Sequence, residues 1–567
     1  MSQELYELTW PGKREAVIEA GRPSDKTLRP CPELSRNFDT TQNLYIEGDN
    51  LEALKILQKS YMKRVKMIYI DPPYNTGHDF IYRDDFSQSE LESQESFNLF
   101  DESGARNFTL NNYRENSRAN PRFHSDWLSM IYPRLKLARN LLSDDGVIFI
   151  SIDDNEAANL RKICDEIFGE SNFIAQIAWK ARSGRQDSKF FAVIHEYILC
   201  YASNANSFIA GGQVKQDDSY PKYDNKAQRF YKTQLLRKWG TNSRREDRPN
   251  LFYAIKAPDG SDVYPMLSDT KEGCWRWSQD TMKQAIEDGR VEFQQQANGS
   301  WIAYEKIFAP LDGEERTKKY TTWIDDISNG TDTLKKLQIP FDYPKSHELI
   351  TRLMKMSNVN DDSIILDFFA GSSTTAHAVM ILNHEDGGSR KFIMIQIPEL
   401  CSESSEAFKA GYKTICDIGR ERILRAGENL SGDTGFRVLR VDSSNYRNVY
   451  FTPEDLTQEM LDDLIENIKP DRNGLDLLYG TIAGLGLSMS LKYSCERVNS
   501  FTVHYYGDNE IIACFDGNIN SELVKYIADK KSSCILFRDS CFGDSNIMIN
   551  FEQIIKHYAP DSEFIIL

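Results

Sequence analysis

The sequence predicts an α/β fold with a mainly parallel central sheet, an inserted domain and a small α/β unit at the C-terminal end. Two observations lead to this class. Apolar runs of strand length alternate with segments of helical periodicity in both halves of the chain, the pattern of an α/β sheet. Between residues 206 and 340 this rhythm is replaced by glycines, aromatic residues and short alternating segments, which indicates an insertion.

The individual elements follow from these runs. The predicted strands are residues 66–70, 146–152, 174–179, 196–201, 363–368 and 391–397. The predicted helices are residues 125–142, 156–168, 347–356 and 374–382. We therefore expect an N-terminal arm (1–40), a first α/β half (41–205), an inserted domain (206–340), a second α/β half (341–431) and a C-terminal domain (432–567).

Length and composition narrow the class of protein. A chain of 567 residues is too long to fold around a single hydrophobic core, and its 40% hydrophobic content is that of a globular protein. No apolar run approaches the roughly 18 residues that span a bilayer, and the N-terminus has no apolar signal core. The ten cysteines include no Cys-x-x-Cys pair, so we expect reduced thiols in a cytoplasmic protein and no metal site.

Charge is unevenly distributed. The net charge of −17 argues against indiscriminate coating of DNA. Residues 214–250 nevertheless hold ten Lys and Arg against five acids, with aromatic residues between them, a pattern common in nucleic-acid contacts. The candidate contacts are Lys180, Arg182 and Arg185 in one loop and Arg237, Lys238, Arg244 and Arg245 in the insertion. For each of these basic segments, the alternative is an ordinary charged surface that is exposed to solvent and binds nothing.

The first motif with a chemical implication is Asp71-Pro72-Pro73-Tyr74, directly after the predicted strand 66–70. An aromatic amine is a poor nucleophile because its lone pair is delocalised into the ring. A carboxylate such as Asp71 and a backbone carbonyl such as that of Pro72 can accept its two N–H groups and free the lone pair. Tyr74 offers a flat face on which an extruded base could stack. A simple turn is the alternative, since Asp-Pro-Pro also favours turns.

The second motif runs from Asp367 through Phe369, Gly371, Ser372 and Ser373 to Thr374, where a predicted strand gives way to a helix. Small residues at such a turn let the backbone approach a ligand at the carboxyl edge of the sheet. Neither a Gly-x-Gly-x-x-Gly nor a phosphate-binding Lys is present. Asp367 is placed to bind an ammonium group, and a purely structural turn is the alternative.

Together the two motifs resemble those of the amino-methyltransferases of DNA, whose adenine branch combines Asp/Asn-Pro-Pro-Tyr/Phe with Asp-x-Phe-x-Gly-Ser-Gly. Here the catalytic motif comes first, which is similar to the permuted β group and unlike the glutamine methyltransferases of release factors. Further runs resemble the modification (Mod) subunits of Type III restriction-modification systems: residues 45–54, 124–134, 145–153, 195–199, 341–346, 414–426 and 514–518. The resemblance covers most of the chain.

This resemblance implies a Rossmann-like fold and methyl transfer from S-adenosylmethionine to N6 of a flipped adenine in double-stranded DNA. By position, Asp71, Pro72, Pro73 and Tyr74 would bind the target base. The donor would be held by Asp49 (adenine), Lys345 (methionine carboxylate), Asp367, Phe369, Gly371, Ser372, Thr374 and Gln396. His195 would position the flipped base or serve only as a structural residue. A homodimer and a helicase-nuclease Res subunit are the implied partners, with the C-terminal domain as their candidate contact.

Two positions depart from the family pattern. Ser373 replaces the last glycine of the donor motif, and Gln396 stands where an acid often holds the ribose hydroxyls, with Glu399 nearby. Three other functions remain open at this stage. They are cytosine-N4 methylation, a catalytically silent DNA-binding subunit of a nuclease complex, and RNA methylation.

Overall fold

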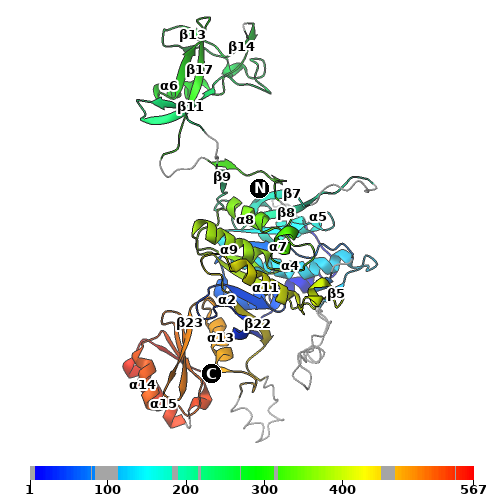
Figure 1. Ribbon diagram of the computed structural model, residues 1–567, viewed down its shortest axis with the longest axis vertical. Coiled ribbons are helices and arrows are strands. Elements are labelled where there is room, and N and C mark those ends of the chain that lie inside the picture. The colour runs from blue at the N-terminus through cyan, green and yellow to red at the C-terminus, as the bar shows by residue number, and fades with distance from the viewer. Residues whose placement is uncertain are drawn as a thin grey trace. The chain divides into compact units, whose positions relative to one another are not determined.

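The computed structural model describes residues 7–77, 80–82, 113–181, 190–214, 219–268, 270–311, 317–327, 329–447, 467–542 and 545–567. The chain forms two compact units. One comprises Met1–Gly211 together with Tyr320–Leu567, and the other is Gly212–Lys319. The elements of both are labelled in Figure 1. No helix of the described residues has the length and apolar character needed to cross a membrane.

A ten-stranded sheet forms the centre of the larger unit. Its strand order is β1-β22-β2-β21-β20-β3-β6-β8-β7-β19. The bounds in that order are Lys26–Pro30, Arg437–Ser443, Leu44–Glu47, Lys391–Gln396, Ile364–Asp367, Val65–Ile70, Leu142–Ile152, His195–Ala202, Phe173–Lys180 and Trp323–Ile324. From β22 to β6 all neighbours are parallel. β8 runs antiparallel to both β6 and β7, so the sheet is mixed rather than wholly parallel.

Alternate residues of the buried strands supply two separate cores. Ile68 and Ile70 of β3 join the core on one face, whereas Met67 and Tyr69 join the core on the other, as the two-residue period of a strand requires. The first face is covered by α1 (Lys13–Glu19), α2 (Asn50–Tyr61), α4 (Phe123–Leu141), α5 (Ala157–Phe168) and α13 (Gly474–Leu485).

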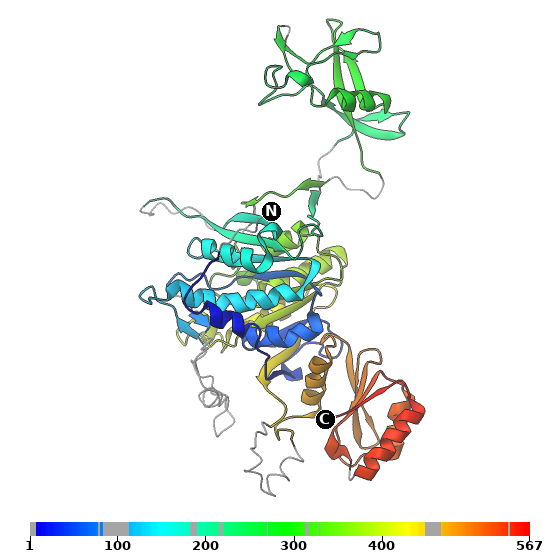
Figure 2. The same cartoon turned by 180° about the vertical axis from the view of Figure 1, so that it is seen from behind.

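The second face is covered by α8 (His347–Met356), α9 (Thr374–Asp386) and α11 (Ile415–Gly427). These three helices are labelled in Figure 1. Figure 2, in which the molecule is turned by 180°, shows the blue and cyan helices of the first face. The predicted helices and strands of both α/β halves are confirmed, with ends that differ by three residues or fewer, except that α9 continues to Asp386 and β6 begins at Leu142.

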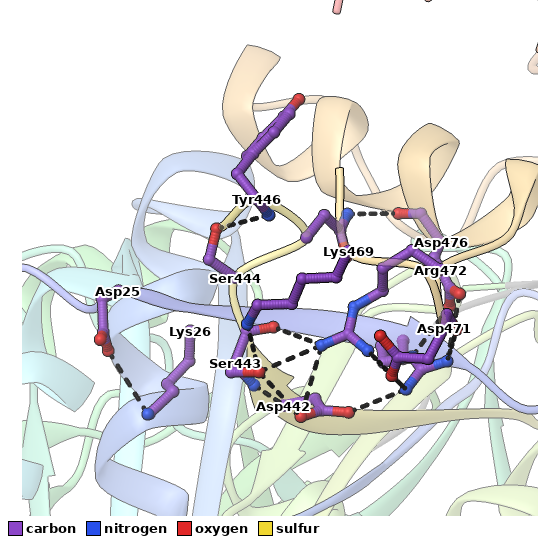
Figure 3. A network of polar contacts seen from close by, with 12 residues as sticks. Asp25, Lys26, Asp442, Ser443, Ser444, Tyr446, Lys469, Asp471, Arg472 and Asp476 are labelled. Atoms are coloured by element: carbon purple, nitrogen blue, oxygen red, sulfur yellow. Dashed lines mark hydrogen bonds and ion pairs between the residues drawn. The ribbon is translucent and has the colours of Figure 1, made fainter. Parts of the chain in front are cut away.

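The central sheet also includes one strand from each of the two outermost predicted segments of the chain. β1 comes from the predicted N-terminal arm and β22 from the predicted C-terminal domain, and they pair antiparallel. Residues that follow β22 in the sequence form a network of polar contacts with the end of that strand (Figure 3). Lys469 Nζ donates to Ser443 Oγ at 2.8 Å, and Arg472 pairs with Asp442 at 3.7 Å.

The C-terminal segment forms a five-stranded sheet of its own. Its order is β23 (Tyr493–Val498), β24 (Phe501–Tyr506), β25 (Ile511–Cys514), β26 (Cys534–Phe537) and β27 (Glu563–Ile566). Two helices, α14 (Ser521–Asp529) and α15 (Ser545–Tyr558), complete it. The small α/β unit that was predicted near this end is therefore present.

The smaller unit is built differently. Its main sheet has the order β10 (Lys222–Asp224), β11 (Arg229–Leu235), β17 (Trp301–Phe308) and β16 (Val291–Gln295). α6 (Gln279–Glu287) and three short antiparallel pairs accompany it: β12–β13 (Ile255–Lys256, Asp262–Val263), β14–β15 (Met266–Ser268, Lys271–Glu272) and β9–β18 (Gly212–Val214, Thr317–Lys319). Trp275 lies in its core, 1% exposed.

The remaining short elements complete the larger unit. β4 (Phe80–Tyr82) pairs with β5 (Tyr113–Glu115). α7 (Thr331–Lys336) and α10 (Glu406–Lys409) are short helices that share a small core with Ile418 of α11. The 3₁₀ turns are η1 (Pro32–Leu34), η3 (Glu170–Asn172), η4 (Pro249–Leu251, in the smaller unit) and η5 (Asp539–Cys541).

Candidate active site

The two predicted motifs end neighbouring strands of the sheet. β20 and β3 pair in parallel, with Leu366 opposite Ile68. Asp367 is the last residue of β20, and Asp71 follows β3 directly. Because parallel strands present their carboxyl ends at one edge, the fold brings the two acids to the same edge of the sheet.

Side chains from the neighbouring helices fix the Asp71-Pro72-Pro73-Tyr74 turn. Trp127 of α4 donates its indole N–H to the carbonyl of Pro73 at 2.7 Å. The next residue, Asn75, has a φ of 60° and is fully buried. Its amide donates to Glu156 Oε1 at 2.6 Å and accepts from Asn116 at 2.8 Å. The left-handed conformation that asparagine tolerates is thus held by hydrogen bonds, and it ends the turn.

Lys345 is the centre of the polar cluster beside this turn. Its Nζ lies 2.5 Å from Glu196 Oε2 and 3.4 Å from Asp71 Oδ1. It also donates to the Tyr74 hydroxyl at 2.5 Å. That hydroxyl in turn lies 2.8 Å from Asp71 Oδ1 and 3.1 Å from Glu196 Oε2. One lysine therefore joins two carboxylates and the tyrosine of the motif.

The same lysine connects the catalytic turn to the donor turn. Its backbone carbonyl accepts from Thr374 Oγ1, the first residue of α9, at 3.4 Å. Its Nζ is also 5.0 Å from the centre of the Tyr74 ring and 5.4 Å from that of Trp179. The two motifs, far apart in the sequence, are therefore joined through a single residue.

Burial and charge shift the pKa values of this cluster in opposite directions. Burial raises the pKa of Asp71, and the Lys345 ammonium opposes the shift. Burial would lower the pKa of Lys345, but Asp71 and Glu196 together raise it above its ordinary value. The lysine is therefore charged at neutral pH, and its ammonium opposes the rise in the pKa of Asp71 in this poorly solvated place.

The donor turn is organised around Asp367. Thr375 Oγ1 donates to Asp367 Oδ2 at 2.6 Å, and the backbone N–H of Phe369 donates to Oδ1 at 3.0 Å. Burial raises the pKa of this carboxyl to about 7, and the two hydrogen bonds oppose the shift. The side chain is 3% exposed. A group that titrates near neutrality at a strand end is typical of a binding site.

The backbone of the turn leaves room for a ligand. Gly371 has a φ of 50°, and a Cβ built on it would meet no atom within 4 Å. Its N–H donates to Gln396 Oε1 at 2.7 Å, so the Gln396 side chain fixes the turn. Ser373 has a φ of 61° and caps α9 in the left-handed conformation, which costs a non-glycine residue about 1–2 kcal/mol. This conformation explains why the family pattern has a glycine there.

Asp49 lies at the end of β2, the third strand along from β3. It caps α2 and accepts from the backbone N–H groups of Leu51 and Glu52 at 2.8 and 3.1 Å. The adjacent Asn50 donates to the carbonyl of Phe368 at 2.7 Å. The strand end that holds Asp49 is therefore attached directly to the donor turn.

The predicted DNA-contacting residues are divided between the two units of the chain. Lys180 and His195 lie opposite each other across β7 and β8, and His195 Nε2 lies 3.1 Å from the Tyr197 hydroxyl. Arg182 and Arg185 lie outside the described residues. The other four, Arg237, Lys238, Arg244 and Arg245, belong to the smaller unit, where Arg245 pairs with Glu272 at 2.7 Å.

Two residues of the site were missed by sequence reasoning. Glu196 is the second carboxylate of the Lys345 cluster, and Arg422 donates to the donor turn from α11. Glu196 could have been found, because it lies in the run of residues 195–199 that matched the family. Arg422 lies in residues 414–426, another run similar to the family, but an arginine in an amphipathic helix is ordinarily exposed and was therefore not singled out.

Comparison with known proteins agrees with this geometry. A family model described as DNA methylase matches residues 65–406. That stretch contains both motifs, the inserted unit and Lys345. The chain belongs to the DNA methylases. The predicted Rossmann-like methyltransferase class is thereby confirmed.

The resemblance to Type III Mod subunits is also confirmed. The StyLTI Mod subunit of Salmonella typhimurium is 36% identical over 468 residues, 81% of this methylase and 68% of the relative. The EcoPI Mod subunit of Escherichia phage P1 is 35% identical over 465 residues, 75% and 68% of the two chains. A Type II methyltransferase, M.KpnI of Klebsiella pneumoniae, is 33% identical over 414 residues, 70% and 90% of the two chains.

The charge balance of the Lys345 cluster makes a pH-dependent prediction. Lys345→Met would leave the buried Asp71 carboxyl without its cation, so the pKa of Asp71 in the folded methylase would rise further above its unfolded value. Stability contributed by a raised carboxyl pKa is present at low pH and lost as pH rises. We expect the melting temperature deficit of this variant to be about 2–4 °C larger at pH 8 than at pH 5.5.

Thermal unfolding of the two proteins across this pH range measures the effect. Lys335→Met, which removes an exposed lysine of α7, is the control and should show no such trend. An equal deficit at both pH values would contradict the assigned charge balance.

Proposed function

We propose that this methylase transfers a methyl group from S-adenosylmethionine to N6 of an adenine in duplex DNA. The observation that supports it best is the position of Lys345, whose side chain contacts Asp71 and Tyr74 while its carbonyl accepts from the donor turn. A base at the first turn and a methyl donor at the second would then lie next to each other. Adenine is favoured over cytosine by Asp71, since the cytosine-N4 branch of the resembling family usually has serine there.

The Asp71 turn acts on the target amine. Both described contacts of the Asp71 carboxylate are made by Oδ1, so Oδ2 is the atom we assign to one amine N–H. Trp127 takes the carbonyl of Pro73, which leaves the Pro72 carbonyl as the proposed acceptor for the second. A carboxylate at Asp71, held beside the amine by Lys345, would favour the positive charge that develops on nitrogen.

The donor turn fits the methionine end of S-adenosylmethionine. Asp367 would pair with its ammonium group, and the open space at Gly371 would admit its chain. Asp49, after β2 and two strands along from β20, is assigned to the adenine. Gln396 is assigned to the ribose through the amide hydrogen that remains, since its Oε1 accepts from Gly371 and its Nε2 donates to the Ile397 carbonyl at 3.1 Å. When bound, the donor supplies a methyl carbon already activated by its sulfonium, so the residues here only align the groups and exclude water.

Recognition of DNA is assigned to the smaller unit. Tyr223, Phe230 and Trp239 are exposed on it, at 45%, 56% and 53%. They alternate with the basic residues proposed above, and such mixtures bind phosphates and bases. Relatives are named as Mod subunits of Type III restriction-modification enzymes, so we propose a Res subunit as a partner; a homodimer, which the family resemblance implies, is a further part of the proposal.

Substitution of Asp71 tests the function. Asp71→Ala should reduce methyl transfer at least a hundredfold, because the amine loses its acceptor, while donor affinity changes less than twofold. The measurement is transfer of a labelled methyl group to duplex DNA, followed by separation of methyladenine from methylcytosine, with donor affinity from calorimetry. Near-normal turnover of the variant would refute the role of Asp71, and methylcytosine as the product would refute N6 specificity.

The raised pKa of Asp367 predicts a pH-dependent donor affinity. A carboxyl with a pKa of about 7 is protonated below neutrality and then no longer attracts an ammonium. We expect the affinity for S-adenosylhomocysteine to fall about tenfold between pH 7.5 and pH 6. Calorimetric titration at several pH values measures it. Asp367→Asn should bind weakly at every pH, and a pH-independent affinity of the unmodified methylase would contradict the assignment.

A further inference from the structure

Arg422 of α11 is fully buried beside the donor turn, at 0% exposure. Its Nη1 donates to Ser372 Oγ at 2.8 Å and to Thr374 Oγ1 at 2.6 Å. α11 approaches the turn closely, since a Cβ built on Gly419 would lie 2.6 Å from Ser373 Oγ and 3.2 Å from the Gly371 carbonyl oxygen. The guanidinium therefore lies against the donor turn and the first turn of α9.

The charge of Arg422 has no counterpart in the described part of the chain. No carboxylate lies within ion-pair distance of it there, and its Nε and Nη2 have no hydrogen-bond partner. Burial lowers its pKa to about 9. The neighbouring His347 and His377, whose rings stack 4.8 Å apart, do not supply a negative charge. A buried cation without an anion is costly, so this place is suited to an anionic group brought by a ligand.

The hydrogen bonds of Arg422 determine which way two hydroxyl groups point. Arginine can only donate, so the oxygens of Ser372 and Thr374 both act as acceptors toward it. The hydrogen of each hydroxyl is therefore free to be donated elsewhere. Thr374 donates its hydrogen to the carbonyl of Lys345 at 3.4 Å, whereas Ser372 has no second described partner and lies at the N-terminus of α9.

Lys345 does not supply the missing charge. Its ammonium is already matched to two carboxylates, Asp71 and Glu196. An anion bound at the donor turn therefore meets three favourable features that Lys345 does not provide: the Ser372 hydroxyl, the backbone N–H groups that begin α9, and the unbalanced charge of Arg422 behind them. The Asp367 carboxylate, at the other side of the turn, suits a cation.

We propose that Arg422 is a positioning residue for the carboxylate of the methyl donor, which it holds through the Ser372 hydroxyl that it orients. The inference rests on the proposed donor, since an α-amino acid group is what an acid and an oriented hydroxyl on opposite sides of one turn would recognise. In this arrangement Asp367 binds the ammonium and Ser372 the carboxylate, and Lys345 serves the catalytic turn.

The test compares two ligands that differ only in the carboxylate. Calorimetry measures the binding of S-adenosylhomocysteine and of its decarboxylated analogue, which retains the amino group. Arg422→Gln should weaken S-adenosylhomocysteine about tenfold or more and leave the analogue within twofold, because a charge-assisted hydrogen bond to the carboxylate is lost. Arg422→Lys should restore part of the affinity.

Ser372→Ala keeps the buried arginine and removes only the oriented hydroxyl, so it tests the proposal even if Arg422→Gln does not fold. It should show the same selective loss, and the double variant should bind no more weakly than Arg422→Gln alone. Arg437→Gln is the matched control, because Arg437 is also fully buried but bonds to the carbonyls of Phe38, Met489 and Leu491. It should lower the melting temperature without changing affinity for either ligand.

The outcomes separate this inference from the proposed function. Equal weakening of both ligands by Arg422→Gln or by Ser372→Ala would overturn the positioning role. Failure of the unmodified methylase to bind S-adenosylhomocysteine at all would instead overturn the proposed donor.

Discussion

Parallel pairing of β20 with β3 is the constraint on which the site depends. The pairing fixes the ends of the two strands at one edge, and each strand there ends in an aspartate, Asp367 or Asp71. In the sequence, β3 precedes the inserted unit and β20 follows it. Their ends lie together because the two strands pair in the sheet. A shift of one residue in either strand would turn its acid toward the other face. The buried apolar residues of β3 therefore serve the chemistry indirectly, by fixing this register.

The charged side chains at the site fall into two groups, one at the catalytic turn and one at the donor turn. The charges of the first group are paired with one another, whereas those of the second group are not. Around the catalytic turn, Lys345 serves two carboxylates, and the cluster is closed by hydrogen bonds in the structure described here. Around the donor turn, Asp367 and Arg422 are each buried, and neither pairs with an opposite charge in the described part of the chain. A zwitterionic ligand end would satisfy both at once. This is the physical reason why the donor turn is suited to an amino acid group rather than to a phosphate.

Much of this arrangement could be predicted from the sequence. The strand before Asp71 and the strand before Phe369 were evident as short apolar runs, and the structure brings the ends of both to one edge of the sheet. The reversal of β8 was not evident, because an apolar strand in a mixed sheet has the same pattern in either direction. The resemblance assigned Lys345 to the donor carboxylate, whereas in the structure its Nζ forms ion pairs with Asp71 and Glu196. Pairings of this kind depend on packing between distant segments, which periodicity does not encode.

Ser373 and Gln396 show how departures from a family pattern can be absorbed. Ser373 takes the left-handed conformation of the glycine it replaces, and Gln396 uses its amide oxygen to hold the Gly371 N–H. Both residues act on the shape of the turn. The sequence revealed that these positions differed, but only the backbone angles and the hydrogen bond revealed what each side chain does.

The central claim is that base and donor meet between the Tyr74 turn and the Gly371 turn. A crystal structure of the protein with S-adenosylhomocysteine tests it most directly. The sulfur should lie between Tyr74 and Gly371, with the amino acid end beside Asp367 and the adenine toward Asp49. A ligand bound at another edge of the sheet, or with its sulfur directed away from Tyr74, would contradict the claim.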